Sequence, residues 1–137
     1  MTTVAEAQEF FRSHHRAVMI TYRRDGSPQT SPISAATGDD GRLMVSTRET
    51  AMKAKNLARD PRVTLCGVSD EWYGEWVQVD GTAEIVHLPE AMDLLVDCYR
   101  RVAGDHPDWD DYRRAMAAEQ RVMVRVRIDA AGPDVHG

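Results

Sequence analysis

Residues 43–65 read LMVSTRETAMKAKNLARDPRVTL, and this stretch decides the fold because it holds two strand patterns and a short helix. Residues 43–47 and 63–68 alternate with the period of two that is typical of half-buried strands. Residues 51–58 between them are predicted to form a helix. Asp60-Pro61 should end it, because the residue before proline is disfavoured in helical geometry.

The predicted helix carries both lysines of the chain, Lys53 and Lys55, whereas the other fifteen of its 17 basic residues are arginines. A lysine ammonium is a compact point charge that suits a phosphate. Ser46, Thr47 and Arg48, at the preceding strand end, can add hydroxyl and cationic donors beside the free N–H groups of the first helical turn. We therefore predict a phosphate site; the alternative is a solvated helix face that pairs with neighbouring carboxylates.

Composition and charge exclude several classes of protein. The 137 residues suit one domain, 1–137, and no apolar run approaches the roughly 20 residues that span a bilayer. The N-terminus lacks the pattern of a secretory signal, so we expect a cytoplasmic protein without membrane contact. A net charge of -5 argues against nucleic-acid binding. Cys66 and Cys98 lack metal-ligand spacing and are expected to be free.

The remaining segments predict a mainly β protein, an antiparallel barrel of about six strands with helical additions. Asp25-Gly26 indicates a hairpin, and Gly81 suggests a bulge. Residues 129–137 should be a loose tail. The predicted strands are 17–22, 29–35, 43–47, 63–68, 75–87 and 122–128, and the predicted helices are one that ends near Ser13, 51–58, one that opens at Pro89 and one capped by Asp108.

Residues 27–34, SPQTSPIS, form a second candidate site. Pro28 and Pro32 cannot donate to a sheet ladder, so the strand is expected to lie at an edge or to contain a bulge near Pro32. Its free backbone groups could then read the polar edge of a flat ring. The equally good alternative is an edge strand made rich in proline to prevent aggregation.

Residues 72–78, WYGEWVQ, could stack on a ring, but an interface or core role is favoured. No metal centre is predicted, since the five histidines show neither HExxH nor paired Cys/His spacing. The chain also lacks a nucleophile elbow, a P-loop and a GxGxxG fingerprint, and no general acid or base stands out.

Taken together, DGSPQTSPIS, VSTRE, KAKNLARDPRVTL and VQVDGTAEI resemble the split β-barrel family of pyridoxamine 5′-phosphate oxidase. YRRVAGDHPDWDDYRRAM resembles the branch that uses the deazaflavin coenzyme F420. The resemblance implies a homodimer with two cofactor sites, each built from both chains. Many relatives carry Ser or Arg just before the phosphate lysine, where this chain has Ala51 and Met52.

The resemblance also implies roles for individual residues. Lys53 would meet the cofactor phosphate, helped by Ser46 and Thr47, and Lys55 and Arg59 would reach an acidic cofactor tail. Along the isoalloxazine-type ring would run the backbone of Gln29, Thr30, Ser31 and Pro32. The strand that in relatives approaches the partner's site carries Trp76 and Gln78.

The expected function is that of an oxidoreductase in which reduced F420 donates hydride to a small organic substrate. One alternative is an FMN-dependent oxidase or reductase on the same barrel. The other is a flavin, F420 or haem-type binding protein without catalytic activity.

Overall fold

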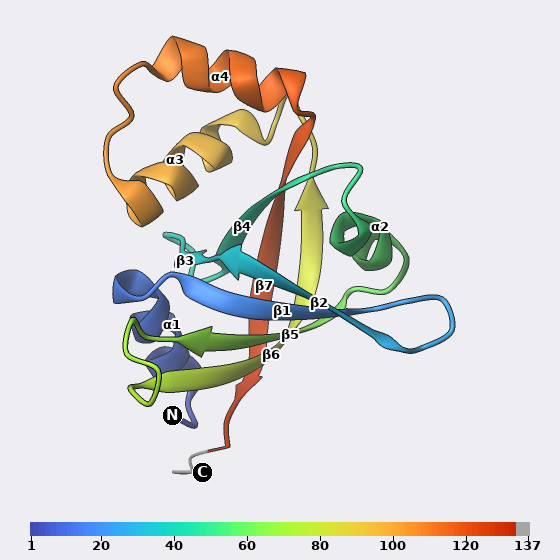
Figure 1. Cartoon of the computed structure of the whole chain (residues 1–137), viewed down its shortest axis with the longest axis vertical. Helices are drawn as coiled ribbons and strands as arrows, with labels where there is room; N and C mark the ends of the chain where they lie inside the picture. The colour runs from blue at the N-terminus through green and yellow to red at the C-terminus, as the bar shows by residue number, and fades with distance from the viewer. Residues whose placement is uncertain (134–137) are drawn as a thin grey trace.

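The structure, a computed structural model, describes residues 1–133. Within this range the chain forms one antiparallel sheet of seven strands, curled into a half-barrel, with four helices (Figure 1). The strand order is β2-β1-β5-β6-β7-β4-β3, so β2 and β3 are the edges. The strands are β1 (Arg16–Tyr22), β2 (Pro28–Ser34), β3 (Ala36–Thr37), β4 (Leu43–Arg48), β5 (Arg62–Val68), β6 (Trp76–Val86) and β7 (Arg121–Ala131), and the helices are α1 (Val4–Ser13), α2 (Met52–Arg59), α3 (Met92–Ala103) and α4 (Trp109–Ala118).

Helix α1 packs against the inner core of the half-barrel. Thr3 and Glu6 form a capping box that satisfies free N–H groups at its start. Phe11 is fully buried against β5, where a Cβ on Gly67 would stand 2.6 Å from the Phe11 Cζ atom. Glycine at this position therefore lets helix and strand approach closely. The same cluster contains inward side chains of the strands, among them Met19, Leu43, Val45, Leu65, Val77, Val79, Val124 and Val126.

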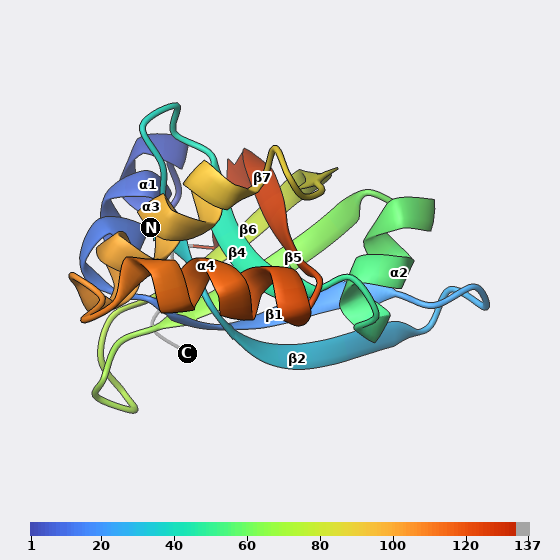
Figure 2. The same cartoon turned by 90° about the horizontal axis from the view of Figure 1, so that it is seen from above.

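Helices α3 and α4 form a hairpin that covers the outer side of β4 and β7 (Figures 1 and 2). Met44 and Met123 lie beneath it, and Leu95 and Tyr112 pack on them from above. The buried Tyr112 hydroxyl donates a hydrogen bond to the Leu95 carbonyl oxygen (2.8 Å), which joins the two helices. The molecule thus has a second hydrophobic cluster, separate from the half-barrel interior.

Helix α2 lies beside the β1–β2 hairpin, held by a chain of hydrogen bonds. The Asn56 side chain, 1% exposed, donates from Nδ2 to Thr21 Oγ1 (3.1 Å), and that hydroxyl donates to Gln29 Oε1 (3.2 Å). The Arg59 guanidinium donates to the Tyr22 carbonyl oxygen. These bonds connect the helix to the first two strands, so they set where its charged side chains stand.

Two predictions about the strands were wrong in detail. The sheet has seven strands rather than six, because the two-residue strand β3 is too short to leave a periodic pattern. The predicted loose tail begins too early: Ala130 and Ala131 pair with β6, so β7 continues to Ala131, and residues 134–137 lie outside the described range.

Helix α3 also begins later than predicted. Residues 89–91 form a turn, in which the Met92 N–H donates to the Pro89 carbonyl oxygen, and the helix starts at Met92. The end of α1, the edge position of β2 and the bulge beside Gly81 are confirmed. No helix within residues 1–133 is long and apolar enough to cross a membrane.

Gly81 offers a test of the bulge. A Cβ there would stand 2.5 Å from the Arg127 carbonyl oxygen, and backbone cannot move aside cheaply. Gly81→Ala should lower the free energy of unfolding by about 1–3 kcal/mol, measured by urea denaturation. The control is Gly38→Ala, whose Cβ would meet the flexible Met44 side chain at 3.4 Å, and it should change that value by less than about 1 kcal/mol. Equal effects of both variants would contradict this account.

Candidate functional site

Helix α2 directs its two lysines to different sides. Residues two apart on an α-helix are separated by roughly 200° around its axis, so Lys53 and Lys55 cannot grip the same small group. Lys53 is half-buried near the start of β7, whereas Lys55 is exposed beside the β1–β2 hairpin. Lys55 also borders a small pocket that contains Val122 at the start of β7, so the helix contributes cations to two neighbouring regions.

The first region surrounds Lys53. Burial, and then the nearby Arg121 guanidinium, lower the pKa of Lys53 below its ordinary value. Arg121 is paired across the sheet with Arg48, and like charges in this position repel each other. The Glu119 carboxylate accepts from both guanidiniums, at 3.0 Å from Arg48 and 2.9 Å from Arg121. Glu119 thus offsets only one of the two paired arginines, and the other nearby carboxylate, Glu49, is 3.0 Å from His87. With Lys53 added, the region has an excess of positive charge, which favours an anion.

Of the two hydroxyls predicted to help Lys53, only Ser46 lies on the same face as Arg121. Alternate residues of a strand face opposite sides, so Ser46 shares the outer face of β4 with Arg48. The Thr47 side chain faces the inside and is 3% exposed. The structure thus places Ser46 in one cleft with Arg121, the neighbour of Lys53, and directs the Thr47 hydroxyl to the other side of the sheet.

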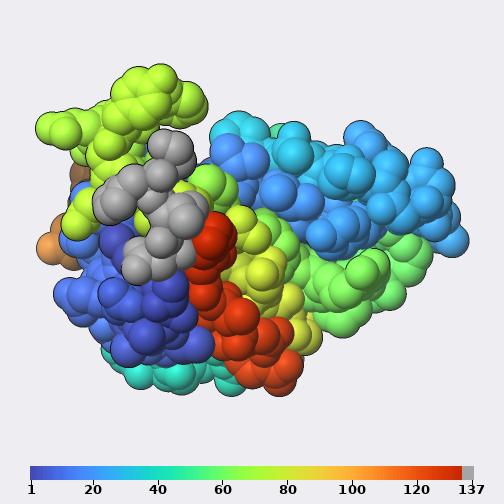
Figure 3. Space-filling model, turned by 90° about the horizontal axis from the view of Figure 1, so that it is seen from below, coloured from blue at the N-terminus to red at the C-terminus, as the bar shows by residue number. Residues whose placement is uncertain are grey.

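The second region is a cleft of about 820 Å³ between α2 and the β1–β2 hairpin, which lie side by side in Figure 3. Lys55 and Arg59 line it from the helix, and Arg23 and Arg24 line it from the hairpin. The one carboxylate in its lining, Asp25, accepts hydrogen bonds from the Ser27 N–H and hydroxyl. Four cations face one acid, so this cleft suits an extended polyanion.

Part of the backbone along the outer edge of β2 makes no hydrogen bond within residues 1–133. Two hydrogen bonds at the ends of the β1–β2 ladder show which residues of β2 bond to β1. One runs from the Arg23 N–H to the Ser27 carbonyl (2.9 Å), and the other from the Ala35 N–H to the His15 carbonyl (2.8 Å). Odd-numbered residues of β2 therefore bond to β1, and even-numbered residues direct their backbone groups to the free edge.

This alternation explains the two prolines. Pro28 and Pro32 occupy free-edge positions, where a missing N–H costs no ladder hydrogen bond, and the register contains no bulge. Between them, Thr30 supplies the one N–H that faces the free edge. The side chain of Gln29 turns back to its own strand, where Nε2 donates to Ser31 Oγ (2.9 Å). Two carbonyls of this edge already accept hydrogen bonds, that of Pro28 from Arg23 and that of Thr30 from the Gln29 side chain (both 2.8 Å). Between the prolines the edge thus offers the Thr30 N–H as a donor, with the Pro32 carbonyl as an acceptor beside it.

Trp76 and Gln78 lie apart from these groups. Across the sheet the register places Pro32, Val18, Cys66 and Gln78 in one row of the outer face. Three strand spacings separate Pro32 from Gln78, roughly 14 Å at about 4.8 Å per strand. Within one chain, therefore, the predicted ring contacts on β2 and the residues of β6 do not meet.

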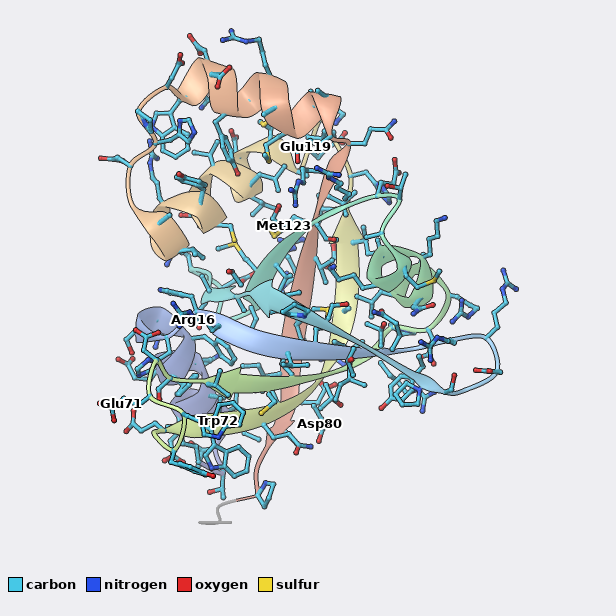
Figure 4. The ribbon with its side chains drawn as sticks, in the orientation of Figure 1. Arg16, Glu71, Trp72, Asp80, Glu119 and Met123 are labelled. Carbon is cyan, nitrogen blue, oxygen red and sulfur yellow. The ribbon has the colours of Figure 1, made fainter. Side chains whose placement is uncertain are left out.

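The loop before β6 is more exposed than predicted. The sequence favoured a core or interface role for these aromatics, but Trp72 is 82% exposed and Tyr73 97% exposed, so neither belongs to the core. Figure 4 shows Trp72 beside the loop that joins β5 to β6, at the same end of the sheet as Arg16.

The structure offers no activated cysteine. Burial raises the pKa of Cys66, and it raises that of Cys98 to about 12, so neither thiol is a ready nucleophile. Both cysteines are free. Within residues 1–133, no three His, Cys, Asp or Glu side chains are arranged to hold a metal ion.

Sequence reasoning missed three of the cations. Arg121 opens the last strand, and only its pairing with Arg48 brings it near Lys53. Arg23 and Arg24 precede the predicted hairpin turn, and the turn pattern gives no indication of a binding role for them. Their proximity to α2 depends on how the sheet curls, which local sequence patterns do not report.

The comparisons with known proteins agree with this fold. The sequence profile described as pyridoxamine 5′-phosphate oxidase matches residues 3–132. The conserved hypothetical protein Rv2991 of Mycobacterium tuberculosis is similar in structure, with a TM-score of 0.76 and 27% identity over 100% of this chain and 94% of that one.

Two further solved structures share the fold at lower identity. An F420 reductase has a TM-score of 0.71 and 21% identity, covering 91% of this chain and 94% of its own. A heme binding protein from Mycobacterium smegmatis has a TM-score of 0.70 and 18% identity, covering 94% of this chain and 52% of its own. Because the family profile spans nearly the whole sequence, the chain belongs to the pyridoxamine 5′-phosphate oxidase family.

Proposed function

We propose that this protein is an F420-dependent oxidoreductase that reduces a small organic substrate. The observation that carries the proposal is the division of positive charge on the two sides of α2. A phosphate needs only the region around Lys53, and FMN and F420 both have one. A second cationic cleft is lined by Lys55, Arg59, Arg23 and Arg24. It would contribute to binding only if the cofactor has an additional acidic tail.

The residues of the chain then hold and orient the cofactor. Lys53 and Ser46 bind its phosphate, and the free edge of β2 reads the polar edge of its ring through the Thr30 N–H and the Pro32 carbonyl. When bound in its reduced form, F420 supplies the hydride. The absence of an activated side chain near these groups within residues 1–133 suits a site whose protein part positions and shields the reactants.

We further propose a homodimer that pairs the outer faces of β1, β5 and β6. Val18 is 40% exposed near the middle of this face, with Cys66 beside it on β5, and Ile20, Val68 and Trp76 lie on the same face. Exposed apolar patches of this kind mark interaction surfaces. A second copy would cover the patch and bring its own Trp76 and Gln78 toward the first copy's cofactor, which one chain alone cannot do.

Two lysine variants separate F420 from FMN, the second candidate cofactor. Lys53→Ala should weaken both cofactors by about 1.5–3 kcal/mol, because both lose a charge-assisted phosphate contact. Lys55→Ala should weaken F420 about two- to five-fold and leave FMN unchanged, since FMN has no tail. Titrations followed by tryptophan fluorescence measure all four affinities.

The two variants control for each other, because each removes one of the chain's two lysines from the same helix. An unchanged affinity of Lys53→Ala for both cofactors would refute the phosphate site. Tight FMN binding without F420 binding would support the FMN-dependent alternative. Cofactor binding without any substrate reduction across a panel of electron acceptors would favour a binding protein.

The lowered pKa of Lys53 predicts a pH dependence of binding. The charged ammonium binds phosphate, so affinity should be highest below the pKa of Lys53 and fall as pH rises through it, earlier than for an ordinary lysine. Titrations of FMN or F420 from about pH 7 to about pH 10 measure this fall. Lys53→Arg, which stays charged throughout, should remove it. A wild-type affinity that does not change with pH would contradict the role of Lys53.

The dimer has a direct test in Val18→Glu. A carboxylate at the centre of an apolar interface would be buried without a partner, so the variant should be monomeric. Light scattering after size-exclusion chromatography measures the mass. The matched control is Val4→Glu, since Val4 is similarly exposed, at 36%, but lies on α1. A dimer that survives Val18→Glu would place the interface elsewhere.

A further inference from the structure

A cleft of about 440 Å³ lies between the α3–α4 hairpin and the outer side of the sheet. Leu95 and Tyr99 line it from α3, and Tyr112 and Met116 line it from α4. The cleft is open to solvent, so a ligand can enter it. Its volume falls in the range of small-molecule sites, which are mostly apolar with a few polar groups.

The walls of the cleft are preformed. The Tyr99 and Tyr112 ring centroids are 5.1 Å apart, and Trp109 packs edge-on against both, at 5.8 Å from Tyr99 and 5.5 Å from Tyr112. The hydrogen bond from the Tyr112 hydroxyl to the Leu95 carbonyl holds the helices together. A flat apolar molecule could therefore bind without first ordering its site.

Polar groups converge on the sheet side of the cleft. Ser34, Ser46 and Arg121 all line it, and neither serine hydroxyl has a hydrogen-bond partner within residues 1–133. Figure 4 shows Met123 beneath the helical hairpin and Glu119 at the junction of α4 and β7. Arg121 lines the cleft at this junction.

Arg121 is the informative member of this group. One of its terminal nitrogens, Nη2, donates to Glu119 (2.9 Å), whereas Nη1 has no hydrogen-bond partner in the described part of the chain. Its Nε, like that of Arg125, is buried without a partner. The free Nη1 can therefore donate to an anionic or carbonyl oxygen of a molecule in the cleft. The carboxylate that also lines the cleft, Asp111, is 3.6 Å from the Arg114 guanidinium, which offsets its charge.

We infer that this cleft binds a flat, mostly apolar molecule with one anionic group, which Arg121 recognises. Arg121 is also close to Lys53, and Ser46 is the hydroxyl proposed to bind the cofactor phosphate, so a molecule bound here would lie next to the proposed cofactor. Its assignment as the substrate of the reaction rests on the proposed function, whereas the binding site itself does not.

Two matched dyes test the inference on the full chain without cofactor. 8-Anilinonaphthalene-1-sulfonate carries an aromatic amine and a sulfonate, and N-phenyl-1-naphthylamine has the same rings without the charge. Fluorescence titration of the wild-type protein should give an affinity for the sulfonate about tenfold higher or more. Arg121→Gln should remove this preference and leave the neutral dye within about twofold of its wild-type affinity.

A second pair of variants localises the dyes. Ala115 lines the cleft, so Ala115→Trp should fill it and weaken both dyes about tenfold. Ala118→Trp adds the same side chain on the exposed side of α4 and should change neither. If Arg121→Gln does not fold, as judged by circular dichroism, Arg121→Lys provides the test and should reduce the preference for the sulfonate.

Dye affinities that Ala115→Trp leaves unchanged would overturn the inference, because the dyes would then bind elsewhere. Equal loss of both dyes in Arg121→Gln would overturn the role of Arg121. F420 titrations of Ala115→Trp keep the two proposals distinguishable. If Ala115→Trp binds both F420 and the dyes as the wild type does, only the cleft is rejected. If the dyes bind as predicted but F420 does not bind, only the proposed cofactor is rejected.

Discussion

The hydrogen bonds from Asn56 to Thr21 and from Thr21 to Gln29 are the interaction on which the rest of the site depends. Asn56 and Thr21 are almost completely buried, and a buried polar group without a partner costs about 1–3 kcal/mol. The network therefore stabilises one position of α2 relative to the first two strands. That position places Lys53 toward the start of β7 and Lys55 toward the hairpin, and both cationic regions follow from it.

The position of α2 also relates charge to function. A cofactor phosphate beside Lys53 would sit between the basic cleft on one side and the α3–α4 cleft on the other, with Ser46 and Arg121 common to the phosphate region and the second cleft. An acidic tail, a phosphate and an apolar substrate would thus find separate surfaces around one helix. The free edge of β2 would be open to the proposed cofactor's ring, because Pro28 and Pro32 prevent another strand from pairing there.

Much of the fold was predictable because its signals are local. The capping box at Thr3, the proline after Asp60 and the bulge at Gly81 each act within a few residues. The short strand β3 and the late start of α3 carry no such signal. The site was predictable only in part: Lys53 and Ser46 stand out in the sequence, whereas Arg121 joins them through strand pairing over more than 60 residues.

The most direct test of the central claim, that charge on both sides of α2 selects a tailed deazaflavin, is a pair of titrations of the wild-type protein. F420 and FMN are added separately, and stoichiometry and affinity are measured by calorimetry at matched ionic strength. The account predicts one F420 per chain, bound more tightly than FMN, with the difference shrinking as salt screens the cleft. Equal affinities for the two cofactors, or no binding of either, would contradict it.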